Sequence, residues 1–165
     1  MQKSLPYLAI IIVLLYALYN AKFRHVKKKA EPKTDTNYAK HIKEHGTVTH
    51  MQEELAKLQT QQYLKKYIID VINHGSAQFD FPGGQMEGGF ASANDAPKIA
   101  CYVLELSGKQ CKEPYPKDAA MFYSSICAGC HGEDGKGLNG SYPDLTKDKL
   151  LGIQKRESFL KRIMK

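Results

Sequence analysis

The stretch from Ala119 to Gly137 reads AAMFYSSICAGCHGEDGKG and contains two cysteines and a histidine within five residues. Its first half carries apolar residues at helical spacing, which predicts a helix that runs into Cys127. Cys127 and Cys130 are separated by two residues, and His131 follows directly. The sequence therefore places a C-x-x-C-H motif at the end of a helix.

This motif favours covalent haem over the other sites that paired cysteines can form. Each cysteine can form a thioether with one haem vinyl group, and the histidine can bind the iron. A thioredoxin-like dithiol would need a βαβ pattern, which is absent. A zinc site would need a second ligand pair, which Cys101 and Cys111 do not form; a disulfide and two separate thiols both fit their spacing. We expect haem c held by Cys127 and Cys130, with His131 on the iron.

The surroundings of the motif resemble the class I c-type cytochromes. Tyr123 and Ala119 occupy positions where that family carries an aromatic and a small residue, which pack the first helix on the last. His131–Gly137 resembles the bacterial C-H-G-x-D-G-x-G signature. Pro143 resembles the family's proline, whose carbonyl accepts a hydrogen bond from the axial histidine and so orients it. The resemblance implies a small helical haem domain.

The parts of such a domain occur here in an unusual order. The chain ends at Lys165, inside what would be the family's middle helix. Upstream, Ile68–Gly75 resembles the end of a middle helix, Phe81–Gly89 a methionine loop, and Asp95–Val103 the final helix. The order over residues 63–165 resembles the membrane-anchored cytochrome c subunit (subunit III) of cbb-type haem–copper oxidases, with the first haem motif missing. Either a two-domain cytochrome has lost parts, or the two halves fold together as one permuted domain.

The second axial ligand of the iron is left open by the sequence. The methionine-loop resemblance points to Met86 as the metal ligand. His74 would give bis-histidine ligation, and an iron without a sixth protein ligand could bind a small molecule. Met121 and Met164 are expected to be core residues.

The N-terminal segment is predicted to be a membrane anchor. Leu5–Tyr19 contains no charge and is shorter than the roughly 20 residues of a full span, so a cleaved signal peptide also fits. No clear cleavage site follows, and Tyr16, Tyr19 and Lys22 suit a membrane interface, which favours an uncleaved anchor. Basic residues after the span favour a cytoplasmic remainder, but haem is attached to c-type cytochromes after export. We therefore expect the bacterial inner membrane, with the haem domain facing the periplasm.

The remaining sequence predicts a mainly α-helical chain, with a transmembrane helix followed by the small haem domain. Residues 22–48 are basic and polar, which indicates a loosely structured linker. His41 and His45 within it are four residues apart, a spacing that could bind metal on a helix, but we expect both to be solvated. A capping box at Thr49 predicts a helix that continues to His74. Further helices are expected from Ala96, from about Asp118, near 147–152 and over 158–165, and no strand pattern is present. The expected divisions are 1–21 (anchor or signal segment), 22–48 (linker), 49–110 (degenerate cytochrome half) and 111–165 (haem-attachment half).

These features together predict a membrane-anchored, single-haem c-type cytochrome that carries electrons in a respiratory chain, as an oxidase subunit or beside one. The expected partners are the membrane and redox proteins, including oxidase subunits. The net charge of +7 is concentrated beside the apolar segment, which favours lipid headgroups over nucleic acid. No small-molecule substrate is expected. A haem-based sensor and a relic fragment of a dihaem oxidase subunit are the alternatives.

Overall fold

The structure is a computed structural model that describes residues 10–16, 34–111 and 116–165. The chain divides into two compact units, residues 1–31 and 32–165. In the first, residues 10–16 are helical and their large apolar side chains are exposed. Among the described residues, no helix has both the length and the apolar character that a membrane crossing requires. The rest of the predicted Leu5–Tyr19 anchor lies outside the described residues.

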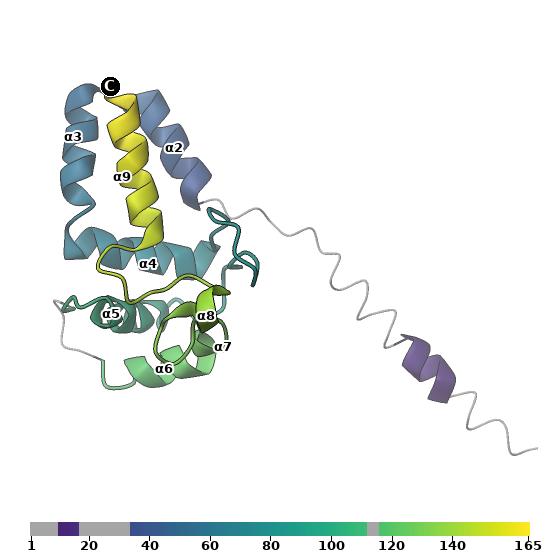
Figure 1. The fold of residues 1–165 in the computed structure, drawn as a ribbon. Helices are drawn as coiled ribbons and strands as arrows, with labels where there is room; N and C mark the ends of the chain where they lie inside the picture. The colour runs from purple at the N-terminus through teal and green to yellow at the C-terminus, as the bar shows by residue number, and fades with distance from the viewer. Residues whose placement is uncertain (1–9, 17–33, 112–115) are drawn as a thin grey trace, which may run out of the picture. The chain divides into compact units, whose positions relative to one another are not determined.

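The second unit is helical, as predicted, and its described part contains no strand beyond one isolated bridge between Ser76 and Met86. Its helices are α2 (Thr34–His45), α3 (Val48–Lys57), α4 (Gln61–His74), α5 (Ala96–Leu106), α6 (Ala119–Ile126), α7 (Ala128–His131), α8 (Gly137–Gly140) and α9 (Leu151–Ile163). Helix α4 contacts α2 and α5, α5 also contacts α6, and α3 contacts α9 (Figure 1).

The helix expected from Thr49 to His74 is two helices, which corrects the prediction. Helix α3 begins earlier, because the side chain of Thr47 accepts a hydrogen bond from the His50 amide at 3.2 Å. The helical conformation is interrupted at residues 58–60. Thr60 then caps α4, because its side chain accepts a hydrogen bond from the Tyr63 amide at 3.3 Å. The apolar pattern runs across the break without interruption, so periodicity alone did not reveal it.

The expected linker over 22–48 is wrong for residues 34–45, which form α2. Two apolar residues one turn apart anchor this helix: Ile42 is 1% exposed and belongs to the core, and Tyr38 packs against it. Such a narrow apolar stripe is a weak sequence signal, because most of the helix is polar. Residues 22–33 lie outside the described part of the chain.

Helix α5 lies between α4 and α6 and forms the centre of the core. Ile99, Ala100 and Leu104 on this helix are completely or almost completely buried. The helix begins after Asp95 with proline in its first turn, as predicted, and Gly108 follows its end with φ of +74°. Packing of α5 between α4 and α6 joins segments from both halves of the sequence in one unit.

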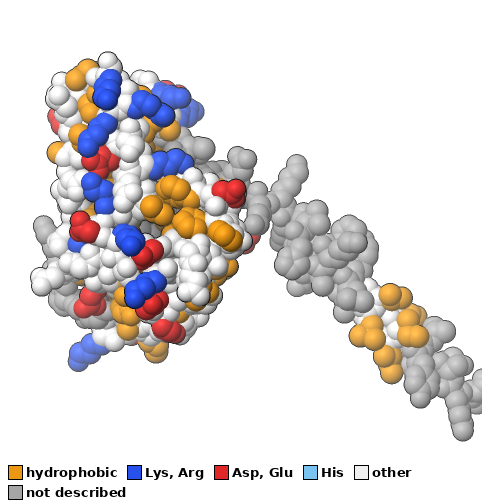
Figure 2. Space-filling model, viewed as in Figure 1, with side chains coloured by type: hydrophobic (Ala, Val, Ile, Leu, Met, Phe, Trp, Pro, Cys, Tyr) orange, Lys and Arg blue, Asp and Glu red, His pale blue; other side chains and the backbone are white. Residues whose placement is uncertain are grey.

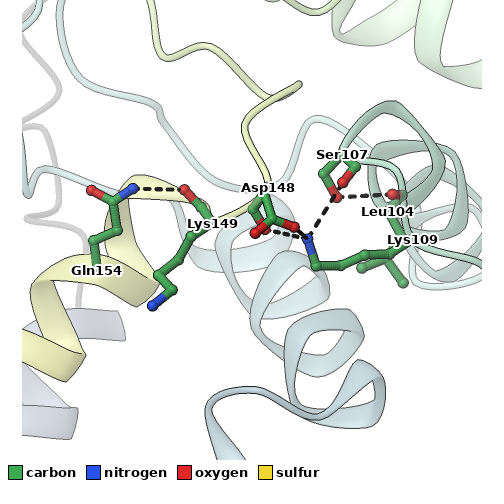
Figure 3. Close-up of polar contacts among 6 residues, drawn as sticks. All are labelled: Leu104, Ser107, Lys109, Asp148, Lys149 and Gln154. Atoms are coloured by element: carbon green, nitrogen blue, oxygen red, sulfur yellow. Dashed lines mark hydrogen bonds and ion pairs between the residues drawn. The ribbon is translucent and has the colours of Figure 1, made fainter.

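A disulfide connects Cys101, buried in α5, to Cys111 in the segment that leads toward α6. Nearby, Lys109 joins the end of α5 to the segment before α9: its ammonium donates to the backbone carbonyl of Asp148 and lies 3.0 Å from the carboxylate (Figure 3). It also donates to the Ser107 carbonyl at 3.4 Å. Covalent and polar links therefore both fix the end of α5.

The two short helical stretches expected at 147–152 and 158–165 are one helix, α9, which corrects the prediction. Ile153 and Leu160 are buried, and they lie seven residues apart on one face. Arg156 is also buried, and its guanidinium lies 4.3 Å from the centre of the Tyr38 ring and 4.5 Å from that of Tyr67. This stacking connects α9 to α2 and α4.

Candidate functional site

The C-x-x-C-H motif forms a helical turn that continues from α6 into α7. The Cys127 amide donates to the Tyr123 carbonyl at 2.7 Å, and the His131 amide donates to the Cys127 carbonyl at 2.9 Å. Both motif cysteines are free thiols; Cys127 is half-buried and Cys130 is exposed. The two sulfurs and the imidazole therefore come from consecutive positions of a single turn.

His131 is buried, and its ring is held by a hydrogen bond. Nδ1 lies 3.2 Å from the carbonyl oxygen of Pro143, which was the partner expected from the sequence. With the proton on Nδ1 the ring donates to this carbonyl, and Nε2 keeps its lone pair. Burial lowers the pKa of His131, and the hydrogen bond to Pro143 acts in the opposite direction. A neutral, oriented imidazole is the form that binds metal.

Tyr123 connects the helix before the motif to the residue that follows His131. Its side chain is fully buried, and its hydroxyl donates to the Gly132 carbonyl at 2.9 Å, one residue after His131. Its ring centre lies 4.7 Å from that of Tyr102 on α5, so the segment that resembles the family's final helix packs against the motif helix. Ala119, the first residue of α6, is fully buried. These contacts pack the motif helix on α5 as the resemblance implied.

The predicted methionine loop contacts, through Gly83, the segment that follows the C-x-x-C-H motif. Its amide donates to the Ser141 carbonyl at 2.8 Å, and a Cβ at Gly83 would collide with the ring of Tyr142. The Tyr142 ring centre is in turn 6.2 Å from that of His131. Sequence reasoning singled out neither Gly83 nor Tyr142, because their contact joins residues far apart in the chain.

Met86 itself is held at the end of α4. Its amide donates to the Ser76 carbonyl at 3.0 Å and its carbonyl accepts from the Ser76 amide at 2.9 Å. Its partly buried side chain packs against the core. Met164 does the same, as predicted, whereas Met121 is 58% exposed and its assignment to the core was wrong. In α6 the buried positions are Ala119 and Tyr123, so Met121 lies on another side of the helix.

His74, the alternative axial ligand, is already engaged on the surface. Its Nδ1 lies 2.9 Å from the Asp70 carboxylate, and its side chain is 61% exposed. A cavity of about 350 Å³ lies elsewhere, between α2, α9 and Gln78, and includes none of the motif residues. Hydrophobic side chains also gather over the loop between α4 and α5 (Figure 2), where the rings of Phe79 and Phe81 meet edge to face.

The residues present fit a covalently attached haem. Both thiols are available on one turn, and Nε2 of His131 has no hydrogen-bond partner among the described residues. A Cβ at Gly129, between the two cysteines, would meet no heavy atom within 4 Å, so the surface there is open. No group of three or more histidine, cysteine, aspartate or glutamate side chains in the described part could hold a bare metal ion. Haem iron does not need such a group, because the macrocycle supplies four of its ligands.

The turn, the oriented histidine and the helix packing agree with what the resemblance to class I c-type cytochromes implied. The chain is 45% and 44% identical over 75 residues to the cbb3-type cytochrome c oxidase subunit CcoP of two strains of Helicobacter pylori. This similarity confirms the resemblance to the cytochrome c subunit of cbb-type oxidases. It covers 43% of this chain and 26% of those proteins, so the chain spans about a quarter of the length of these relatives. No protein-family profile and no solved structure matches the chain.

Proposed function

We propose that this chain is a membrane-anchored, single-haem c-type cytochrome that carries electrons in a respiratory chain as a subunit of a haem–copper oxidase. The observation that carries the proposal is the turn from Cys127 to His131, with its imidazole aligned by Pro143. The similarity to the oxidase subunit CcoP supports the respiratory role.

In this proposal each residue of the site has one task. Cys127 and Cys130 hold haem c through thioethers, and His131 binds the iron through Nε2. Pro143 keeps the imidazole in one orientation and one tautomer. When bound, the haem supplies an iron that accepts and returns one electron. Burial of His131 lowers its pKa, which stabilises the ligand in its neutral form.

Met86 is proposed as the second axial ligand. The loop that carries it contacts the segment after the motif through Gly83, and the competing His74 is paired with Asp70. The thioether sulfur is a soft, neutral ligand, which favours ferrous iron relative to a second histidine and raises the reduction potential.

The proposed location is the bacterial inner membrane, with residues 5–19 as the anchor and the haem domain in the periplasm. The disulfide between Cys101 and Cys111 supports this side of the membrane, because disulfides persist in oxidising compartments. N-terminal sequencing of the membrane-extracted protein tests the anchor. A start near Met1 is expected, and a soluble chain that starts near Ala21 would identify a cleaved signal peptide instead.

Haem staining after denaturing electrophoresis tests the attachment. The wild-type chain should stain, and the double variant Cys127→Ala/Cys130→Ala should not. Met86→Ala is the matched control, because it should keep the stain while losing the weak red absorption of methionine-ligated ferric haem and gaining carbon monoxide binding. Stain in the double cysteine variant would refute haem attachment. Loss of the red band in Met164→Ala but not in Met86→Ala would refute only the axial assignment.

A further inference from the structure

Three histidines that the proposed electron carrier does not use gather where α2 meets α3. His41 and His45 lie one turn apart on α2, and His50 lies in the first turn of α3. The ring centre of His41 is 5.4 Å from that of His45 and 5.5 Å from that of His50. The sequence predicted two solvated histidines on a linker, and it did not point to the third.

The fold builds this cluster through the short link between the helices. The Gly46 amide donates to the Ile42 carbonyl at 2.8 Å, and a Cβ at Gly46 would collide with that same carbonyl. Thr47 then caps α3 through the His50 amide. Because Ile42 is buried in the core, α2 cannot rotate freely. The link through Gly46 and Thr47 and the buried Ile42 therefore hold His41 and His50 close together.

One nitrogen of the cluster is buried without a partner. Nε2 of His50 is shielded from solvent and makes no hydrogen bond to any described residue. An unpaired buried nitrogen is unfavourable, and native structures usually satisfy such a group with water, an ion or another side chain. The ring of His41 is the one whose contact with the His50 ring is described above.

The ring separations suit shared coordination. Two imidazoles that bind one zinc ion with tetrahedral geometry place their ring centres about 5 Å apart, given Zn–N distances near 2 Å. Both measured separations lie close to this value. Neutral imidazole prefers zinc, copper and nickel, whereas magnesium and calcium prefer oxygen ligands.

We propose that His41 and His50 bind a divalent transition-metal ion of the zinc type. The described residues contain no group of three side chains already arranged to hold a metal, so two imidazoles carry the site and water completes the coordination. His45 lies close enough to His41 to join after rotation of its exposed side chain. An ion at this position would join α2 to α3.

Calorimetric titration with zinc chloride tests the site on the full purified chain, with free thiols alkylated so that cysteines do not compete. One zinc ion per chain should bind, and magnesium should not. His41→Ala should weaken zinc binding about tenfold or more, because losing a ligand costs at least as much as losing a group that supports one. His50→Ala should weaken it as well.

His74→Ala is the matched control, because His74 is an exposed helical histidine on α4 that is paired with Asp70. This variant should bind zinc as the wild type does. Circular dichroism shows whether the His41 and His50 variants keep their helical content. The proposal is overturned if folded His41→Ala binds zinc with unchanged affinity, if the wild type binds none, or if His74→Ala loses as much affinity. None of these outcomes depends on haem attachment, so a failure here leaves the proposed function intact.

Discussion

Replacing Tyr123 with phenylalanine tests whether a single hydrogen bond fixes the haem-attachment segment to its supporting helix. The Tyr123 hydroxyl is buried and donates to the Gly132 carbonyl at 2.9 Å. Phenylalanine keeps the ring that packs on Tyr102 and removes only the hydroxyl. The change therefore isolates one polar contact directly behind His131.

The expected loss of stability in Tyr123→Phe depends on whether the Gly132 carbonyl keeps another hydrogen-bond partner. Gly132 also accepts a hydrogen bond from the Gly135 amide at 3.1 Å, so its oxygen is not left unpaired. The loss should correspond to one net hydrogen bond, about 1 kcal/mol in the free energy of unfolding. For a unit of roughly this size the melting temperature should fall by about 3–5 °C. Tyr123→Ala, which also removes the ring, should cost about 3–5 kcal/mol.

Thermal unfolding followed by circular dichroism measures both effects. Tyr102→Phe is the matched control, because it removes a hydroxyl from the facing ring that makes no hydrogen bond to a described residue. Its melting temperature should stay within about 1–2 °C of the wild type, as expected for a change below about 0.5 kcal/mol. Equal melting temperatures for Tyr123→Phe and Tyr102→Phe would show that the bond to Gly132 does not stabilise the segment.

Three further changes test other parts of the unit. Cys111→Ser should lower the free energy of unfolding in urea by about 2–3 kcal/mol, because it opens the loop of ten residues closed by the disulfide to Cys101; reductant should then destabilise the wild type but not the variant. Gly83→Ala should cost about 1–3 kcal/mol by thermal unfolding, because its methyl group collides with the Tyr142 ring, and an unchanged stability would contradict the contact. Hydrogen bonds from two lysines lower the pKa of Glu157 below its ordinary value of 4.5, so its contribution is present above that pH and is lost as the pH falls through the lower pKa of the folded state. Acid unfolding of Glu157→Gln should therefore be less steep than that of the wild type below about pH 4.5, and identical slopes would exclude the effect.

The local part of the site could be predicted from the chain because its chemistry is carried by neighbouring residues. Cys127, Cys130 and His131 share one helical turn, and the hydrogen bond to Pro143 spans only twelve residues. The presence of helices α5 and α6 was also predictable, because each carries apolar residues at helical spacing, but the exposure of Met121 on α6 was not. The roles of the two motif cysteines, His131 and Pro143 toward haem remain predictions.

Helix boundaries were less predictable where apolar spacing continued across a break. The chain between α3 and α4 keeps its periodicity, and only the cap at Thr60 separates the two helices. Helix α2 was missed because its core contact rests mainly on Ile42 and Tyr38. In both cases a single capping or packing contact decided the structure, and such a contact carries little weight in a pattern averaged over many residues.

The order of residues along the chain is sufficient to define the C-x-x-C-H turn, because helical geometry sets where residues one to four positions apart must lie. Tertiary structure alone decides the contacts between distant segments, Tyr102 on Tyr123 and Gly83 on Tyr142. Such contacts form only when the burial of α5 and Ile42 outweighs the entropy lost in closing the intervening chain. That balance depends on the whole core, and no local pattern of residues records it.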